Sequence, residues 1–167
     1  MKKPTFFQKY KYLSFLPALF IIGMIFRSSS QTYKEQDLRP LLTQYLPIDI
    51  IKKLFNDVSF TYAGKLISIE TVGVSGFVEF FLRKGAHFGV FFVLSLTLFI
   101  AIYNLTKKLT KSAILTFIGF SSYAIIDETH QGFTGGRSPL IQDVFVDISG
   151  GTTALCIILV LFLFRKK

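Results

Sequence analysis

The sequence is poor in the residues that stabilise small secreted domains or mark familiar catalytic motifs. Only one of its 167 residues is cysteine, so a disulfide framework is excluded, and we expect Cys156 to be a small buried hydrophobe rather than a catalytic thiol. There is no Gly-x-Ser-x-Gly and no His-Glu-x-x-His motif, and the paired histidines of lipid phosphatases are missing. The chain therefore carries no recognised nucleophile motif.

Acidic residues are also scarce, with 10 against 19 basic residues and a net charge of +9. Such a charge in a soluble protein can indicate nucleic-acid binding, but its distribution excludes that class here. Ten basic residues and no acidic ones lie in three short segments, 1–11, 107–111 and 165–167. The rest of the chain is almost neutral, so the basic excess is a topology signal rather than a ligand-binding patch.

Hydrophobic residues make up 51% of the chain, more than a soluble domain of this size can hide. A membrane-spanning helix needs about 20 residues, and short apolar stretches must recruit polar flanking residues to cross. We therefore predict an all-α membrane protein with one domain and four transmembrane helices. Their expected bounds are about 12–28, 82–103, 110–127 and 144–164.

The charge pattern also predicts the orientation of these helices. Basic segments face the cytoplasm, which places both termini and the loop at 107–111 inside and the segments 27–84 and 127–143 outside. The first apolar stretch follows a basic tail, as in a signal peptide, but Arg27-Ser28-Ser29-Ser30 lacks the small-x-small end of a cleavage site. We expect a multi-pass protein of the cell membrane whose first helix is retained.

The long outer segment is expected to contain a short amphipathic helix at 47–55. Ile48, Ile51 and Phe55 recur there at helical spacing, and Pro47 suits a first helical position. This helix is expected to lie on the membrane surface or to cap the helix bundle. The pattern at 59–76 alternates weakly and contains three glycines, which indicates irregular structure or a short strand.

Ionisable residues near membrane spans are costly and are therefore functional candidates. Lys84 and His87 share one face of the second span, although Lys84 can also reach lipid headgroups and His87 can clamp two helices. Asp127, Glu128 and Gln131 follow the third span, where Gln131 lies three residues after Glu128 and four after Asp127.

Further polar residues surround the last loop. Arg137, in a glycine-containing turn, suits a phosphate or carboxylate, or serves as a headgroup anchor. His130 is expected to be an exposed interfacial side chain.

Asp143 and Asp147 open the fourth span four residues apart, and Asp147 is expected within the bilayer. There it needs a partner, for which Arg137, Lys84 and His87 are the candidates. Gly150 and Ala154 form a small-residue pair that favours close helix packing and would bring Asp147 against a neighbouring helix.

These residues form one candidate site at the outer face. The predicted ligand-binding residues are Lys84, His87, Glu128, Gln131, Arg137, Asp143 and Asp147. Any catalytic role would fall to His87, Glu128 or Asp127. No cofactor is predicted. No metal is predicted either, a metal ion bound by these three residues being the less favoured alternative. Acid–base chemistry on a membrane-embedded substrate, an ion-paired binding pocket, and a cluster that only holds the bundle together all remain open.

The order of these motifs along nearly the whole chain resembles the VanZ-like family. The matching positions are Ser29-Ser30-Gln31 with Gln36, then Lys84, His87 and Phe88, then Glu128, Gln131, Phe133, Gly136 and Arg137, and finally Asp143, Asp147 and Gly150. Two positions depart from the pattern: Val90 stands where many members have an acid, and Gly135 where many have proline. The first removes one acid from any mechanism.

The name member of that family is associated with low-level resistance to teicoplanin, a glycopeptide that binds cell-wall precursors. The resemblance thus implies a cell-envelope protein linked to glycopeptide resistance. Its partners would be the lipid bilayer and either a lipid-linked cell-wall precursor or the glycopeptide, with no nucleic acid. The alternative is an intramembrane hydrolase or transferase acting on a lipid phosphate, with His87 as acid or base, Glu128 or Asp127 as its partner and Arg137 as the phosphate clamp.

Overall fold

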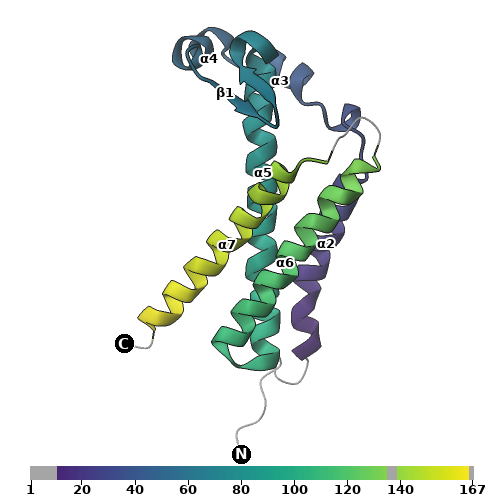
Figure 1. Ribbon diagram of the computed structural model, residues 1–167, viewed down its shortest axis with the longest axis vertical. Coiled ribbons are helices and arrows are strands. Elements are labelled where there is room, and N and C mark those ends of the chain that lie inside the picture. The colour runs from purple at the N-terminus through teal and green to yellow at the C-terminus, as the bar shows by residue number, and fades with distance from the viewer. Residues whose placement is uncertain (1–10, 135–138, 166–167) are drawn as a thin grey trace, which may run out of the picture.

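Four long helices form a bundle with a small hairpin at one end, in a computed structural model that describes residues 11–134 and 139–165 (Figure 1). The elements in chain order are η1 (Lys11–Phe15), α2 (Leu16–Ser29), η2 (Lys34–Gln36), α3 (Arg39–Tyr45), α4 (Ile48–Phe55), β1 (Ser59–Tyr62), β2 (Lys65–Ser68), α5 (Ile69–Thr106), α6 (Leu109–Gly132) and α7 (Ile141–Phe164). Four helical segments, η1 with α2, then α5, α6 and α7, are long and apolar enough to cross a membrane. The predicted class, an all-α membrane protein with four spans, is confirmed.

The segment 59–76 forms a hairpin followed by the start of a helix. Its sequence had indicated either irregular structure or a short strand. β1 and β2 pair antiparallel, and the two residues between them, Ala63 and Gly64, have φ values of +49° and +77°. Positive φ at both central positions gives the turn that suits the twist of a two-residue hairpin. Ser68 and Thr71 then form a reciprocal capping box, which begins α5 directly after the hairpin.

α5 is far longer than a membrane span. Its backbone is kinked at Gly73, where φ is +73°, and the residues after it, 74–106, correspond to about 50 Å, against a hydrocarbon core of about 30 Å. Its first turns project beyond α2, α6 and α7 and carry the hairpin, α3 and α4 (Figure 1).

The amphipathic helix α4 therefore does not cap the bundle. Its Ile48 and Ile51 pack instead, as their spacing predicted, on a separate apolar cluster centred on Ile67, Val74 and Phe77.

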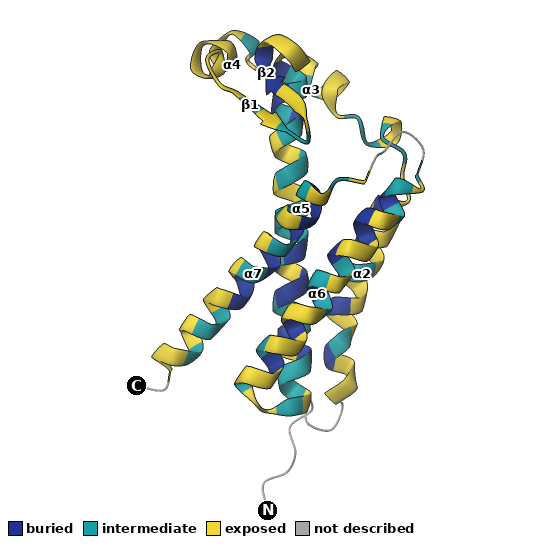
Figure 2. Ribbon diagram, viewed as in Figure 1, coloured by how far each residue is buried: buried dark blue, intermediate teal, exposed yellow. Residues whose placement is uncertain are grey.

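The core of the bundle lies where α5 faces the other three long helices, around Phe91, Leu94, Phe120 and Ala124. Figure 2 shows the buried residues along these facing sides and the exposed ones around the outside. Many exposed residues are large and apolar, as expected where lipid rather than water surrounds the helices. Cys156 is among the exposed residues on α7, so the expectation that it is buried was wrong.

α7 crosses α5 at very short range. A Cβ added to Gly150 would lie 2.2 Å from the backbone oxygen of Phe88, and Ala154 is fully buried one turn further on. The close packing predicted for this small-residue pair is confirmed. Because Phe88 follows His87, the contact fixes α7 beside the polar residues of α5.

Candidate functional site

The candidate site residues gather at one end of the bundle, where α2 and α6 end and α7 begins; we call this the polar end. Of the predicted set, Arg137 with its neighbours Gly135 and Gly136 lies outside the described residues. The others are buried or half-buried. They come from three helices, and the structure joins them in pairs.

Two ion pairs connect α5 to α7. Lys84 Nζ lies 2.5 Å from Asp143 Oδ1, and His87 Nδ1 lies 3.0 Å from Asp147 Oδ1. Lys84 therefore turns inward rather than toward lipid headgroups. Tyr62 of the hairpin also donates its hydroxyl to Asp143 Oδ1 at 2.5 Å. Burial, together with this hydrogen bond, raises the pKa of the Tyr62 hydroxyl well above its ordinary value.

Asp127 connects α6 to α2. Its two oxygens accept hydrogen bonds from Ser29 Oγ at 2.6 Å and from Gln131 Nε2 at 2.8 Å, the latter bond joining the two residues that lie four apart. Ser29 belongs to the Ser-Ser-Gln element at the end of the first span, so the tertiary structure brings that motif to the acids of α6.

Glu128 closes the loop between α6 and α7. Its Oε1 accepts a hydrogen bond from the backbone N–H of Leu140 at 2.6 Å. Its Oε2 is buried and has no hydrogen-bond partner among the described residues. Glu128 is thus only half satisfied, in a place where a ligand with a donor group or a positive charge would complete it.

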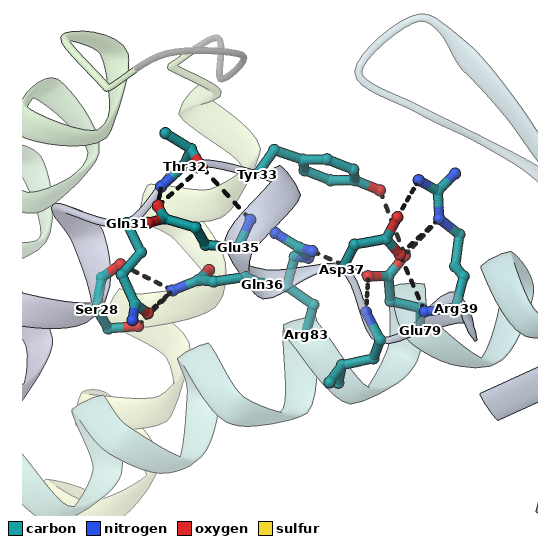
Figure 3. Close-up of polar contacts among 11 residues, drawn as sticks. Ser28, Gln31, Thr32, Tyr33, Glu35, Gln36, Asp37, Arg39, Glu79 and Arg83 are labelled. Carbon is teal, nitrogen blue, oxygen red and sulfur yellow. Dashed lines mark hydrogen bonds and ion pairs between the residues drawn. The ribbon is translucent and has the colours of Figure 1, made fainter. Parts of the chain in front are cut away.

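A second polar cluster, which sequence reasoning missed, surrounds Glu79 in the projecting part of α5 (Figure 3). This carboxylate, only 4% exposed, accepts hydrogen bonds from Arg83 at 3.1 Å and from the backbone N–H of Leu38 at 3.1 Å. Tyr33 donates its hydroxyl to the same carboxylate at 3.3 Å. An acid four residues before an arginine inside an apolar run was the available signal.

These contacts hold the segment between α2 and α3 against α5. Arg39 binds Asp37 through side-chain and backbone hydrogen bonds, which lowers the pKa of Asp37 to about 2, and the same pairing raises the pKa of Arg39. Burial and the nearby Glu79 raise the pKa of Tyr33. Gln36, part of the resemblance, donates to the backbone oxygen of Ser28 at 2.8 Å and ties the segment to the end of α2.

Two adjoining cavities open at the polar end. One, of about 430 Å³, lies between α2, α5 and α6, with apolar walls from residues such as Met24, Leu82 and Val90. The other, of about 550 Å³, lies under the hairpin and is lined by charged side chains together with apolar ones such as Ile67, Phe80 and Leu140. Its cationic side chains are Arg39, Lys65, Arg83 and Lys84, and its carboxylates are Glu79, Glu128 and Asp143. Four residues line both cavities: Glu79, Arg83, His87 and Gln131.

His130 differs from its expectation. It is half-buried, and its ring stacks on Phe26 with centroids 4.6 Å apart and an angle of 9° between the planes. The ring therefore packs against α2 instead of standing free in the interface. A sequence contains no signal for this contact, because Phe26 and His130 are brought together only by the parallel packing of α2 and α6.

Fold and site together define a class: a small four-helix membrane protein whose buried acids and bases gather at one end of the bundle. The family model described as VanZ/LLP1 matches residues 14–164, which is nearly the whole chain. The chain belongs to the VanZ/LLP1 family, as the order of its motifs predicted. Comparisons with curated proteins and with solved structures found no match.

Proposed function

We propose that this protein binds an anionic, lipid-linked ligand at its polar end and contributes in this way to resistance against glycopeptides of the teicoplanin type. The observation that carries the proposal is the pair of adjoining cavities. Apolar walls between α2 and α5 suit a hydrocarbon chain, while arginine and lysine side chains suit a phosphate. The four residues that line both cavities lie where the hydrocarbon chain of such a lipid would join its phosphate head group.

Topology supports a role in the cell envelope. The positive-inside rule puts the polar end outside, where glycopeptides meet the lipid-linked precursors to which they bind. A protein that occupies or presents such a precursor there would alter the access of the drug. Teicoplanin susceptibility should therefore differ between cells with wild-type protein and cells with Glu128→Gln at matched expression, while Asp57→Asn, an exposed acid outside both cavities, should resemble wild type.

Binding can be measured directly with farnesyl diphosphate and protein in nanodiscs. Lys65 and Lys53 are both exposed, but only Lys65 lines a cavity, so the two form a matched pair. Loss of a charge-assisted contact of about 1.5 kcal/mol should make binding about tenfold weaker in Lys65→Met and leave it unchanged in Lys53→Met. Equal affinities in both variants and in wild type would refute the proposed head-group site.

The role of the apolar cavity needs a separate test. Val90→Trp fills part of the cavity between α2 and α5 without changing a charge. It should weaken farnesyl diphosphate binding and leave inorganic diphosphate unaffected, because only the former has a hydrocarbon chain. If both probes bind wild type equally well, the ligand is a free phosphate rather than a lipid.

A second candidate function, hydrolysis or transfer at a lipid phosphate, is favoured by the His87–Asp147 pair. A buried carboxylate that orients a histidine is the arrangement of a general base, and His87 lines both cavities. Lipid phosphates extracted from membranes with wild-type protein and with His87→Ala should then differ by mass spectrometry. An unchanged lipid-phosphate profile would refute catalysis and leave ligand binding as the proposed function.

A further inference from the structure

Three side chains from three different helices meet at the polar end. His87 of α5, Asp127 of α6 and Asp147 of α7 each offer one ligand atom, and these atoms lie within 4.8 Å of one another. Both aspartates are almost completely buried, with exposures of 3% and 0%. One imidazole nitrogen with two carboxylate oxygens is a donor set that suits Zn²⁺ or Mn²⁺.

Asp147 gives an independent sign of a missing ligand. Its Oδ1 contacts His87, but its Oδ2 is buried and has no hydrogen-bond partner among the described residues. Buried carboxylate oxygens are nearly always satisfied, and an unsatisfied one in a native protein calls for an ion or a water. A cation between the three side chains would satisfy it.

The balance of charge points the same way. Asp127, Asp147 and the adjacent Glu128 are three buried carboxylates, and His87, which is charged only when protonated, is the only basic side chain within the described residues that pairs with any of them. Lys84, the nearest lysine on α5, is already paired with Asp143. Buried carboxylates without a counter-charge are expensive, and a divalent cation would neutralise two of them.

The surroundings of the three residues are also those of a metal site. Ser29 and Gln131 each donate a hydrogen bond to Asp127, which fixes the orientation of its carboxylate in the way that outer-shell partners orient metal ligands. The cavity between α2, α5 and α6 reaches both His87 and Asp127. It provides a path from outside and room for the remaining ligands, which would be water or phosphate oxygens.

We propose that His87, Asp127 and Asp147 bind one divalent metal ion of the Zn²⁺ or Mn²⁺ type. The sequence predicted no metal, and the set it considered paired His87 with the neighbours Asp127 and Glu128. The structure replaces Glu128 with Asp147 in this set. Asp127 of α6 and Asp147 of α7 both lie close to His87, whereas Glu128 accepts a hydrogen bond from the backbone of Leu140.

The test is a titration of chelator-treated protein in nanodiscs with Zn²⁺ and with Mn²⁺, followed by calorimetry and by metal analysis. Wild type should bind a single equivalent, and the bound ion should raise the unfolding temperature. Asp147→Asn should bind about 100-fold more weakly, and Ser29→Ala, which removes only an orienting bond, about tenfold more weakly. The control is Asp57→Asn, an exposed acid outside both cavities and outside the three ligands, which should retain full binding.

A spectroscopic measurement on wild type keeps the proposal testable if a variant fails to fold. Mn²⁺ bound to the protein should show electron spin-echo modulation from a directly coordinated imidazole nitrogen, which only His87 at this site supplies. Absence of a stoichiometric ion, absence of that nitrogen signal, or equal binding by Asp147→Asn would each overturn the proposal. The titration contains no farnesyl diphosphate, so absence of farnesyl diphosphate binding in a protein that still binds the metal would refute the proposed function alone.

Discussion

Substituting alanine for Gly150 tests whether the backbone contact between α5 and α7 is what holds the polar end together. The new Cβ would lie 2.2 Å from the Phe88 oxygen, whereas ordinary van der Waals contact begins near 3.4 Å, so α7 must retreat by about 1 Å. Asp147 lies three residues earlier on the same face of α7. Its hydrogen bond to His87, now 3.0 Å, would lengthen to about 4 Å and be lost.

The expected loss of stability combines three effects. Overpacking costs about 1–3 kcal/mol, and loss of a hydrogen bond to a charged group costs about 1.5–3 kcal/mol. Alanine has the better helix propensity by about 1 kcal/mol, which offsets part of this. Gly150→Ala should therefore destabilise the protein by about 1.5–5 kcal/mol.

Gly89→Ala is the matched control. Gly89 lies in α5, two residues from His87, and a Cβ there would meet nothing within 4 Å. This variant should be as stable as wild type, or up to about 1 kcal/mol more stable. Unfolding in mixed micelles, titrated with SDS and followed by circular dichroism, measures both. If Gly150→Ala unfolds at the same SDS fraction as Gly89→Ala, the backbone contact does not position Asp147 and the reasoning is wrong.

Three further predictions concern the ion pairs of the polar end and of the Glu79 cluster. Lys84→Met should cost about 3 kcal/mol in the same titration, because it leaves Asp143 buried without its cation, and adding Asp143→Asn should recover more than half of that loss. Glu79→Gln should speed hydrogen exchange in residues 31–45, which this carboxylate holds through backbone and side-chain bonds, without changing exchange in α6. The carboxyl of Asp37 should titrate by NMR with a midpoint of about 2. Since this pKa is lowered in the folded state, its stabilising effect is complete above the unfolded value of 3.8 and is lost as the pH falls through about 2, and Arg39→Ala should move the midpoint up toward 3.8.

The helices could be predicted from the sequence because each depends on its own residues. In lipid every backbone polar group must be satisfied internally, so a long apolar run is sufficient to specify a spanning helix. The same holds for α4, whose apolar spacing and preceding Pro47 are local features. The extension of α5 before the second span was not predicted, since charged Arg83 and Lys84 interrupt the apolar pattern while the backbone stays helical back to the kink at Gly73.

The candidate site was predicted as a list of residues but not as a set of contacts. Spacing along one helix placed Gln131 on the same face as both Glu128 and Asp127, and the structure shows its hydrogen bond to Asp127. Sequence reasoning gave three possible partners for Asp147, it offered Gln131 and His87 for Glu128 where the structure has the backbone of Leu140, and it overlooked Glu79 altogether. Each of these contacts joins different helices, so it depends on how the helices rotate and cross.

The sequence by itself therefore determined that this chain is a four-helix membrane protein of the VanZ/LLP1 family, with its acids and bases near the ends of three helices. Hydropathy, charge distribution and motif order are properties of the sequence, and they can be read without any knowledge of how the helices pack. Only the tertiary structure decided that His87 meets Asp147 while Lys84 takes Asp143, that Ser29 holds Asp127, and that two cavities share the residues between them. The physical reason is that each contact joins different helices, and the approach of α7 to the backbone of α5 at Gly150 sets the rotation of α7 that brings Asp143 and Asp147 to their partners.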